Sequence, residues 1–406
     1  MTEIFPALAD ETRSILARLP EIIDMAFPLP SRFRRGLSHD VAELSRLLTS
    51  GRDDRSGSYL GKPALLSAYL RYFMPWNIYR LCRLFRSLPP GLKAHDCVND
   101  LGAGPLTLAA SLWISRPELR SVPLEFRCVD RTPAVLEAGK VFFEKLTATL
   151  SATACPWSIR TIRGEIKRSG ALSIDIRGKP ANLSAAINVY NELFWDMPPG
   201  DSSGTERFAE KQARLLSSLT DKSGSILVVE PGIPRSGNFI SLLRSGFLGE
   251  GRQPLSPCVH GGPCALSSGR AGPGARPKWC HFAFDTEDAP AQLHKLSAAA
   301  NIPKERAVLS FILAGPVSPE KRSNGTAISA KPKKIRIISD AFPVNNDGKN
   351  KWGRYGCGDC GMVLVTGSRD EIERLQSGSE EGLTVSEFKD RKSGAMVAPI
   401  THHHFR

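Results

Sequence analysis

The feature that most constrains this chain is a regular alternation of short apolar runs and helix-length amphipathic segments that begins near Ala94. The runs that predict β-strands are residues 95–101, 124–130, 158–163, 184–190 and 225–230. The segments that predict helices are residues 105–115, 133–148, 204–219 and 237–247. Strand–helix alternation at this spacing is typical of a doubly wound, mostly parallel sheet. We therefore expect an α/β protein with a Rossmann-like core.

The remaining residues divide into regions of different pattern. Apolar residues recur at helical spacing before the core until Pro89, Pro90 and Gly91 end the pattern. Three further strands are predicted at Ala307–Leu313, Lys334–Ser339 and Met362–Val365. The expected regions are a helical N-terminal region (1–93), an α/β domain (94–249 plus 305–366), a cysteine-rich insertion (250–304) and a poorly patterned tail (367–406).

The charge of the chain is strongly basic and unevenly spread. The sequence has 54 Lys and Arg against 41 Asp and Glu, a net charge of +13. Residues 1–95 hold 14 basic and 9 acidic residues and residues 246–345 hold 13 and 7, whereas residues 96–245 hold 18 and 16. A nearly neutral core with basic flanks favours a polyanionic partner, nucleic acid before a membrane surface. A basic enzyme without such a partner is the alternative.

The sequence also bears on location. No apolar run approaches the about 18–20 residues that a membrane helix needs, so we expect no membrane partner. Glu3, Asp10 and Glu11 stand where secretory and mitochondrial leaders avoid acids. We therefore expect a cytoplasmic, monomeric protein without a targeting segment.

Two basic clusters are candidate contacts with RNA phosphates. One is made of Arg32, Arg34 and Arg35, after a proline-rich break in the helical pattern. The other is made of Lys331, Lys333, Lys334 and Arg336. Solvated surface charge is the alternative for each, because a single charge run usually is just that.

A nucleotide-binding loop is predicted at the end of the first strand. Asp100 ends the strand, Gly102 and Gly104 form a Gly-x-Gly turn, and a helix follows. Glycines there let the backbone approach a ligand, and the helix start offers free N–H groups. The acid before the glycines favours adenosyl-methionine over a dinucleotide, and Asp130 at the end of the next strand is placed to bind ribose hydroxyls. Leu106 stands where the usual pattern has a third glycine.

No reaction motif accompanies this loop, and the catalytic residues stay unknown. The fourth strand ends in Asn188, followed by Asn191 and Glu192, instead of the Asn/Asp-Pro-Pro-aromatic motif of many amine methyltransferases. These residues line a pocket or cap a helix. Glu230, at the end of the fifth strand, either faces the crevice or belongs to a simple turn.

Five of the nine cysteines form a separate constellation. Cys82, Cys97, Cys128 and Cys155 are isolated, and we expect them to be small buried hydrophobic residues. The five that lie among Pro, Gly and His are Cys258, Cys264, Cys280, Cys357 and Cys360. Clustered loop cysteines in a protein without a secretory leader predict metal or cluster ligands. Their spacing leaves zinc and an iron–sulfur cluster equally open.

Taken together, these motifs resemble one family. The order of a helical region, LGAGP, VEPG, PCVHGGPC, WCHF and RYGC over about residues 30–366 is similar to the methyltransferase-like small-ribosomal-subunit assembly proteins of mitochondria and bacteria. The resemblance implies a class I methyltransferase fold, binding to small-subunit rRNA and a [4Fe-4S] cluster. It places the cluster ligands at Cys258, Cys264, Cys280 and Cys357, and places the S-adenosylmethionine contacts at Asp100, Gly102, Gly104 and Asp130.

Three functions remain open at this stage. The first is an assembly or translation factor that binds the small ribosomal subunit through its rRNA, with S-adenosylmethionine and a structural cluster bound. The second is an active rRNA methyltransferase. The third is a small-molecule methyltransferase with structural zinc. The basic flanks favour the first two, and the missing reaction motif favours the first over the second.

Overall fold

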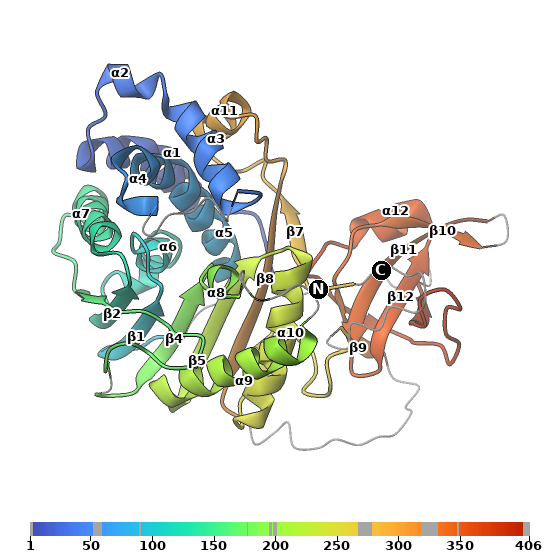
Figure 1. Cartoon of the computed structure of the whole chain (residues 1–406). Helices are drawn as coiled ribbons and strands as arrows, with labels where there is room; N and C mark the ends of the chain where they lie inside the picture. Colours follow the sequence, from blue (N-terminus) through green and yellow to red (C-terminus); the bar gives the residue numbers. More distant parts are fainter. Residues whose placement is uncertain are drawn as a thin grey trace.

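The computed structural model describes residues 3–51, 59–88, 91–176, 178–194, 197, 201–266, 278–317, 332–346 and 349–400. These residues form one β-sheet of eight strands and one of six, and Figure 1 shows the smaller sheet to one side of the larger one. In the described ranges no helix is long and apolar enough to cross a membrane.

The N-terminal region is helical, as expected. Its helices are α1 (Asp10–Ala26), α2 (Ser31–Arg34), α3 (Leu37–Leu48), α4 (Pro63–Ala68) and α5 (Met74–Ser87). A 3₁₀ turn (Tyr59–Gly61) precedes α4, and a π-helical turn (Tyr69–Phe73) joins α4 to α5. Pro63 at the first turn of α4 removes an N–H that would have no helical partner. Buried apolar residues of α1, α3 and α5 belong to the same core as those of α6 and α7.

The main sheet has the alternation that the sequence predicts. Its strands are β1 (Asp96–Leu101), β2 (Leu124–Asp130), β3 (Ser158–Arg163), β4 (Ala181–Ile187), β5 (Thr220–Pro231), β6 (Gln253–Ser256), β7 (Phe282–Asp285) and β8 (Arg306–Gly315). The strand order is β3-β2-β1-β4-β5-β8-β6, with β7 also paired to β8. β1 to β5 pair in parallel, and β8 is antiparallel to β5. The Rossmann-like α/β fold is therefore confirmed.

Helices cover both faces of the main sheet. They are α6 (Thr107–Ser115), α7 (Pro133–Leu150), α8 (Tyr190–Leu193), α9 (Ser202–Leu219), α10 (Pro234–Gly249) and α11 (Ala291–Ala299), with a 3₁₀ turn at Pro117–Leu119. One core contains residues of α6, α7 and the N-terminal helices, and a second contains residues of α8, α9 and α10. Figure 1 shows α9 and α10 on one face, with α6 and α7 on the other. The sheet order reverses between β1 and β4, so a ligand crevice is expected at the carboxyl ends of these strands.

The C-terminal part of the chain, from Lys333 to Pro399, differs from the expected organisation. The second sheet has the order β13-β9-β11-β12-β14, with β10 paired to β11. Its elements are β9 (Lys333–Ile337), β10 (Phe342–Asn346), β11 (Lys349–Gly358), β12 (Gly361–Gly367), α12 (Arg369–Arg374), β13 (Glu380–Leu383) and β14 (Met396–Pro399). The strands predicted near 334–339 and 362–365 therefore lie outside the main sheet, and the expected tail supplies α12, β13 and β14. Ile335, Val363 and Leu383 are among the residues of a separate small core.

The expected insertion is also part of the main architecture. Residues 250–304 contribute β6 and β7, which both pair with β8, together with α11. The sequence does not predict these strands, because β6 and β7 are four residues long and have no strong pattern of their own. Their pairing with β8 is what makes them part of the main sheet.

Candidate functional site

The glycine loop lies between β1 and α6, at the point where the sheet order reverses. Gly102 and Gly104 have φ of 75° and 53°, which are positions that glycine adopts without strain. A Cβ on Gly104 would meet no atom within 4 Å, whereas a Cβ on Gly102 would lie 2.3 Å from Cγ2 of Val189. The loop surface is therefore open at Gly104, and Gly102 is required by close packing within the protein.

Leu106 does not narrow this loop surface. It has φ 57° and ψ 38°, a left-handed conformation that is uncommon for leucine. Its side chain is fully buried, and a Cβ on Gly139 of α7 would lie 2.8 Å from its Cγ. The residue that replaces the third glycine thus packs in the core between α6 and α7.

Two carboxyl groups face each other across the loop. Asp130 accepts hydrogen bonds from the Gly104 N–H (3.0 Å) and the Thr132 N–H (2.8 Å). Asp100 is buried, and its Oδ2 has no hydrogen-bond partner among the described residues. Burial, with repulsion from Asp130, raises the pKa of Asp100 to about 8. A ligand that donates a hydrogen bond or carries positive charge would satisfy this oxygen.

The acid of the fifth strand has a structural role. The Glu230 carboxylate is buried and accepts the backbone N–H groups of Val189 (3.0 Å), Tyr190 (2.8 Å) and Asn191 (3.0 Å). The carboxylate therefore holds the start of α8 against β5, and it is not a ligand-binding group of the crevice. Burial raises the pKa of Glu230 to about 8, although the three N–H groups favour the ionised form.

The segment after the fourth strand has two distinct parts. Asn188 has φ 57° and donates its backbone N–H to Val229 O at 2.7 Å, so it makes a turn. Glu192 forms an ion pair with Arg131 at 3.3 Å, next to the acid that ends β2. The structure thus brings Glu192 to the crevice.

The N-terminal helices supply polar groups to the crevice that sequence reasoning missed. Tyr69 is half-buried and hydrogen-bonds with Asn77, and burial with the charges of Glu192 and Asp130 raises the pKa of its hydroxyl. Local pattern could not reveal these groups, because helix periodicity does not show which side chain faces a distant strand end.

The cysteine site brings together residues from three distant segments. Cys258 and Cys264 lie in the loop after β6, Cys280 precedes β7, and Cys357 is on β11. Burial and then the charges of the other three cysteines raise the pKa of Cys280, so the four sulfur atoms share one environment. Burial, with the charges of Cys264 and Cys258, likewise raises the pKa of Cys357 to about 12.

The fifth candidate cysteine lies apart from these four. Cys360 is in the tight turn between β11 and β12, where Gly358 pairs with Gly361. It packs against the small core of the second sheet, and its neighbouring charges are Lys333 and Asp359. The structure therefore groups Cys357, and not Cys360, with the other three.

Two buried arginines flank the cysteine site. Arg244 of α10 donates from Nε to Cys258 Sγ at 3.2 Å and also binds the carbonyl oxygens of the same loop. Arg336 of β9 donates to Pro257 O at 3.0 Å and pairs with Glu380 at 2.9 Å. Both guanidinium groups favour negative charge on the sulfur atoms, and Arg336 ties the cysteine loop to the second sheet.

His260 also belongs to this site, with its Nε2 3.6 Å from Cys357 Sγ. Across the ranges that the structure describes, no three His, Cys, Asp or Glu side chains have the arrangement of a metal site.

The two basic clusters differ in their surroundings. Arg32 and Arg35 are exposed, and Arg34 pairs with Asp24 at 2.7 Å. In the second cluster Arg336 is buried and internally paired, so it is unavailable to RNA. The acidic partners of Lys333 and Lys334 are Asp359 (3.2 Å) and Glu380 (3.0 Å), and Lys331 lies outside the described residues. Among the described residues the structure therefore removes Arg336 from the predicted RNA contact, and for the exposed members of both clusters that contact stays a prediction.

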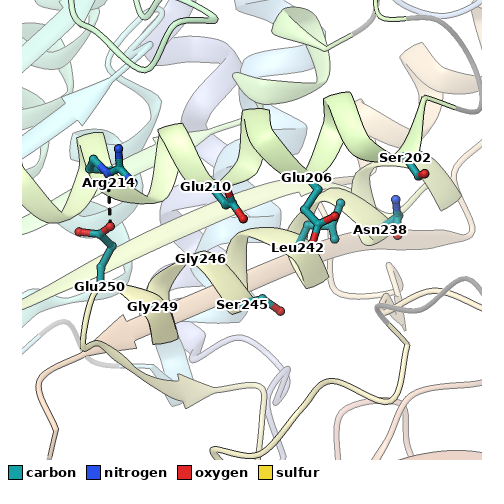
Figure 2. A pocket seen from close by; sticks show the side chains of 10 residues that line it. All are labelled: Ser202, Glu206, Glu210, Arg214, Asn238, Leu242, Ser245, Gly246, Gly249 and Glu250. Atoms are coloured by element: carbon teal, nitrogen blue, oxygen red, sulfur yellow. Dashed lines mark ion pairs between the residues drawn. The ribbon is translucent and has the colours of Figure 1, made fainter.

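A surface groove runs between α9 and α10, as Figure 2 shows. Its charged lining residues are Glu206, Glu210, Glu250 and Arg214, and Arg214 pairs with Glu250 at 3.5 Å. None of the lining residues belongs to the glycine loop or to the cysteine site. The mostly acidic lining does not suit a polyanion.

Comparisons with solved structures give methyltransferases and related proteins at low similarity. The precorrin-6y C5,15-methyltransferase of Geobacter metallireducens is 11% identical, with 58% of this chain and 89% of that chain covered and a TM-score of 0.31. The YcgJ protein of Bacillus subtilis is 12% identical, with 59% and 99% covered and a TM-score of 0.31. The precorrin 8w decarboxylase of Methanobacterium thermoautotrophicum is 12% identical, with 58% and 89% covered and a TM-score of 0.31.

The sequence comparison is more specific. No curated protein matches this chain significantly. Residues 205–341 match the model of the family described as mitochondrial small ribosomal subunit Rsm22. This segment runs from α9 to β9 and includes Cys258, Cys264 and Cys280. The resemblance found in the sequence is therefore confirmed over this segment, which carries the pattern of the Rsm22 family.

Proposed function

We propose that this protein binds the small ribosomal subunit through its rRNA and acts as an assembly or translation factor. The observation that carries the proposal is the Rsm22 pattern over residues 205–341, within which three of the four grouped cysteines lie. The net charge of +13 and the exposed Arg32 and Arg35 support a polyanionic partner.

A [4Fe-4S] cluster held by Cys258, Cys264, Cys280 and Cys357 is the second part of the proposal. The four thiols supply the donor set of a cluster, or of zinc, although among the described residues they do not have the arrangement of a metal site. The raised thiol pKa values favour protonated thiols, which a bound metal would deprotonate. When bound, the cluster would join the loop after β6 to the second sheet, a structural role.

S-adenosylmethionine is the third part, bound at the glycine loop. The open face at Gly104 leaves room for a ligand, and the unpartnered Oδ2 of Asp100 calls for a donor. Each Asp130 oxygen retains a lone pair beyond its backbone bond, so it can accept ribose hydroxyls. The ligand would supply a methyl group if transfer occurs. Asp100 and Asp130 would orient it, and Tyr69 and Glu192 stand beside it without an assigned catalytic role.

Three measurements on one preparation test this function. Anaerobic purification followed by iron, sulfide and zinc analysis should give about four iron and four sulfide per chain. Sedimentation with small ribosomal subunits should recover the protein in the subunit fraction at low salt, with less recovered as salt rises. Incubation of those subunits with methyl-labelled S-adenosylmethionine should leave the rRNA unlabelled.

The other outcomes are equally decisive. Label in the rRNA would establish an active rRNA methyltransferase. Zinc in place of iron, together with no binding to subunits, would favour the small-molecule methyltransferase.

A further inference from the structure

The most exposed large hydrophobic side chain among the described residues lies in the second sheet. Phe388, between β13 and β14, is 80% exposed, and the next is Phe33 at 53%. A single exposed aromatic ring is common on protein surfaces, so its significance here depends on the backbone that holds it and on the side chains beside it.

The segment that carries Phe388 is well braced. Ser386 N donates to Val397 O at 2.8 Å, and Val397 N donates to Phe388 O at 3.1 Å. Farther along, Asp390 N donates to Ala395 O at 2.8 Å. These bonds make a short ribbon, so Phe388 is presented on an ordered backbone and loses little backbone freedom on binding.

The tip of this ribbon is a tight turn. The Asp390 carboxylate accepts the Ser393 N–H at 2.7 Å and the Ser393 hydroxyl at 2.5 Å, and Gly394 has φ 70°. The carboxylate of Asp390 therefore serves the turn itself.

The tip also carries a group of cations. Lys389, Arg391 and Lys392 are exposed, and none has a carboxylate partner among the described residues. The acids in the same segment are Glu387, which is exposed, and Asp390. An exposed ring with cations beside it is the pattern by which proteins contact single-stranded nucleic acid, since bases stack on the ring and phosphates meet the cations.

We propose that the Phe388 tip, residues 386–394, contacts an unpaired stretch of small-subunit rRNA, with a base stacked on the ring and phosphates beside Lys389, Arg391 and Lys392. This inference rests on the proposed function and deepens it. Single-stranded RNA fits better than a protein partner, because one ring among three cations lacks the apolar area of a protein interface.

The test measures binding of full-length protein to a labelled 12-nucleotide single-stranded oligouridine by fluorescence anisotropy across a salt series. F388A and F388L should each weaken binding about tenfold and leave the salt slope unchanged. F388W should bind at least as well as the wild type. The triple variant K389Q/R391Q/K392Q should weaken binding and make the slope shallower.

The control variants separate this effect from others. I174A removes another exposed apolar side chain, which lies outside the second sheet, and should change nothing. A 12-base-pair duplex RNA should not respond to F388A, because its bases are already stacked. Melting temperatures of the Phe388 variants and of the triple cation variant should equal that of the wild type, since the altered side chains are exposed.

Several results would overturn the inference. They are F388A binding within twofold of the wild type, F388L binding like the wild type, or a wild type that does not bind the oligouridine. Sedimentation with small ribosomal subunits distinguishes failure of the Phe388 contact from failure of the proposed function. If the wild type and F388A sediment equally well with subunits, the RNA contact proposed for the Phe388 tip is wrong and the proposed function stands. If neither binds subunits, the proposed function fails.

Discussion

The glycine loop and the cysteine site are built in opposite ways. The loop is a single β1–α6 connection with the acid of the neighbouring strand, and the N–H groups of Gly102, Ala103 and Gly104 all bond within these elements. The cysteine site draws on three segments that span about a hundred residues, and it lies between the two sheets. A local site is organised by chain connectivity, whereas a dispersed site depends on tertiary packing and on whatever its side chains bind.

Both sites nevertheless carry a cost that a ligand would relieve. At the loop the cost is a buried carboxyl with an unpartnered oxygen. At the cysteine site it is the burial of four thiols, which stay protonated unless a bound metal replaces their protons. The comparison predicts that loss of a cysteine affects folding, whereas loss of a loop carboxylate affects mainly ligand binding.

The largest effect is expected at the cysteine site. Cys264→Ser should lower the iron content and the melting temperature together, the latter by about 10 °C or more, because a metal that joins distant segments contributes to folding. Iron analysis measures the iron content, and thermal unfolding measures the melting temperature. Cys360→Ser is the matched control and should change neither. Loss of iron with unchanged stability and RNA binding would show that the cluster has no structural role.

The next effect is on ligand affinity at the loop. Asp130→Ala removes an acceptor of charge-assisted hydrogen bonds and should weaken S-adenosylmethionine binding by roughly tenfold to several hundredfold. Calorimetry measures the affinity. Asp130→Asn keeps the shape of the side chain, and its affinity for S-adenosylmethionine should lie between those of the wild type and Asp130→Ala. No binding by the wild type would remove the ligand from this site, and a stability loss as large as that of Cys264→Ser would break the contrast between the sites.

A smaller effect concerns pH. The pKa of Asp100 is raised to about 8 in the folded chain, so this carboxyl favours folding fully below its unfolded pKa near 3.8 and loses that contribution as the pH rises through 8. Asp100→Asn should therefore melt roughly 3–6 °C above the wild type at pH 9 and close to it at pH 4. Parallel melting curves for the two proteins across this range would contradict the buried, unpartnered state of Asp100.

The smallest effect is expected at the N-terminal arginines. R32Q/R34Q/R35Q should weaken binding to all RNAs by a similar factor. The slope of the logarithm of affinity against the logarithm of salt concentration should become shallower by less than three times the increment for one phosphate contact, because Arg34 is paired with Asp24. The charge-matched control K140Q/R160Q/K211Q alters exposed residues of the nearly neutral core. An unchanged slope in the arginine variant, with binding intact, would leave the basic flank as solubilising charge.

The main sheet and the glycine loop could be predicted because their signals are local. A strand, a Gly-x-Gly turn and a helix follow one another within about twenty residues. The second sheet could not be predicted, since β13 and β14 are four residues long and pair with β9 and β12. Short strands with mixed charge have no pattern that separates them from a tail.

The role of individual residues shows the same division. The sequence presented Glu230 as a candidate crevice acid, and packing instead places it under the start of α8. Leu106 departed from the glycine pattern, and the small residue Gly139 on α7 makes room for its side chain.

What this sequence determined by itself is the alternating α/β core, the identity of the loop residues and the set of five candidate cysteines, because each follows from composition and spacing along the chain. The family resemblance already favours Cys357 over Cys360 as the fourth cysteine, whereas only the tertiary structure gives the physical reason and decides which basic residues stay exposed. Cys357 and Cys360 are three residues apart, yet the strand pairing places one toward the cysteine loop and the other in a turn. Pairing between distant segments causes that difference, and the partners of a strand cannot be identified from the periodicity of its own residues.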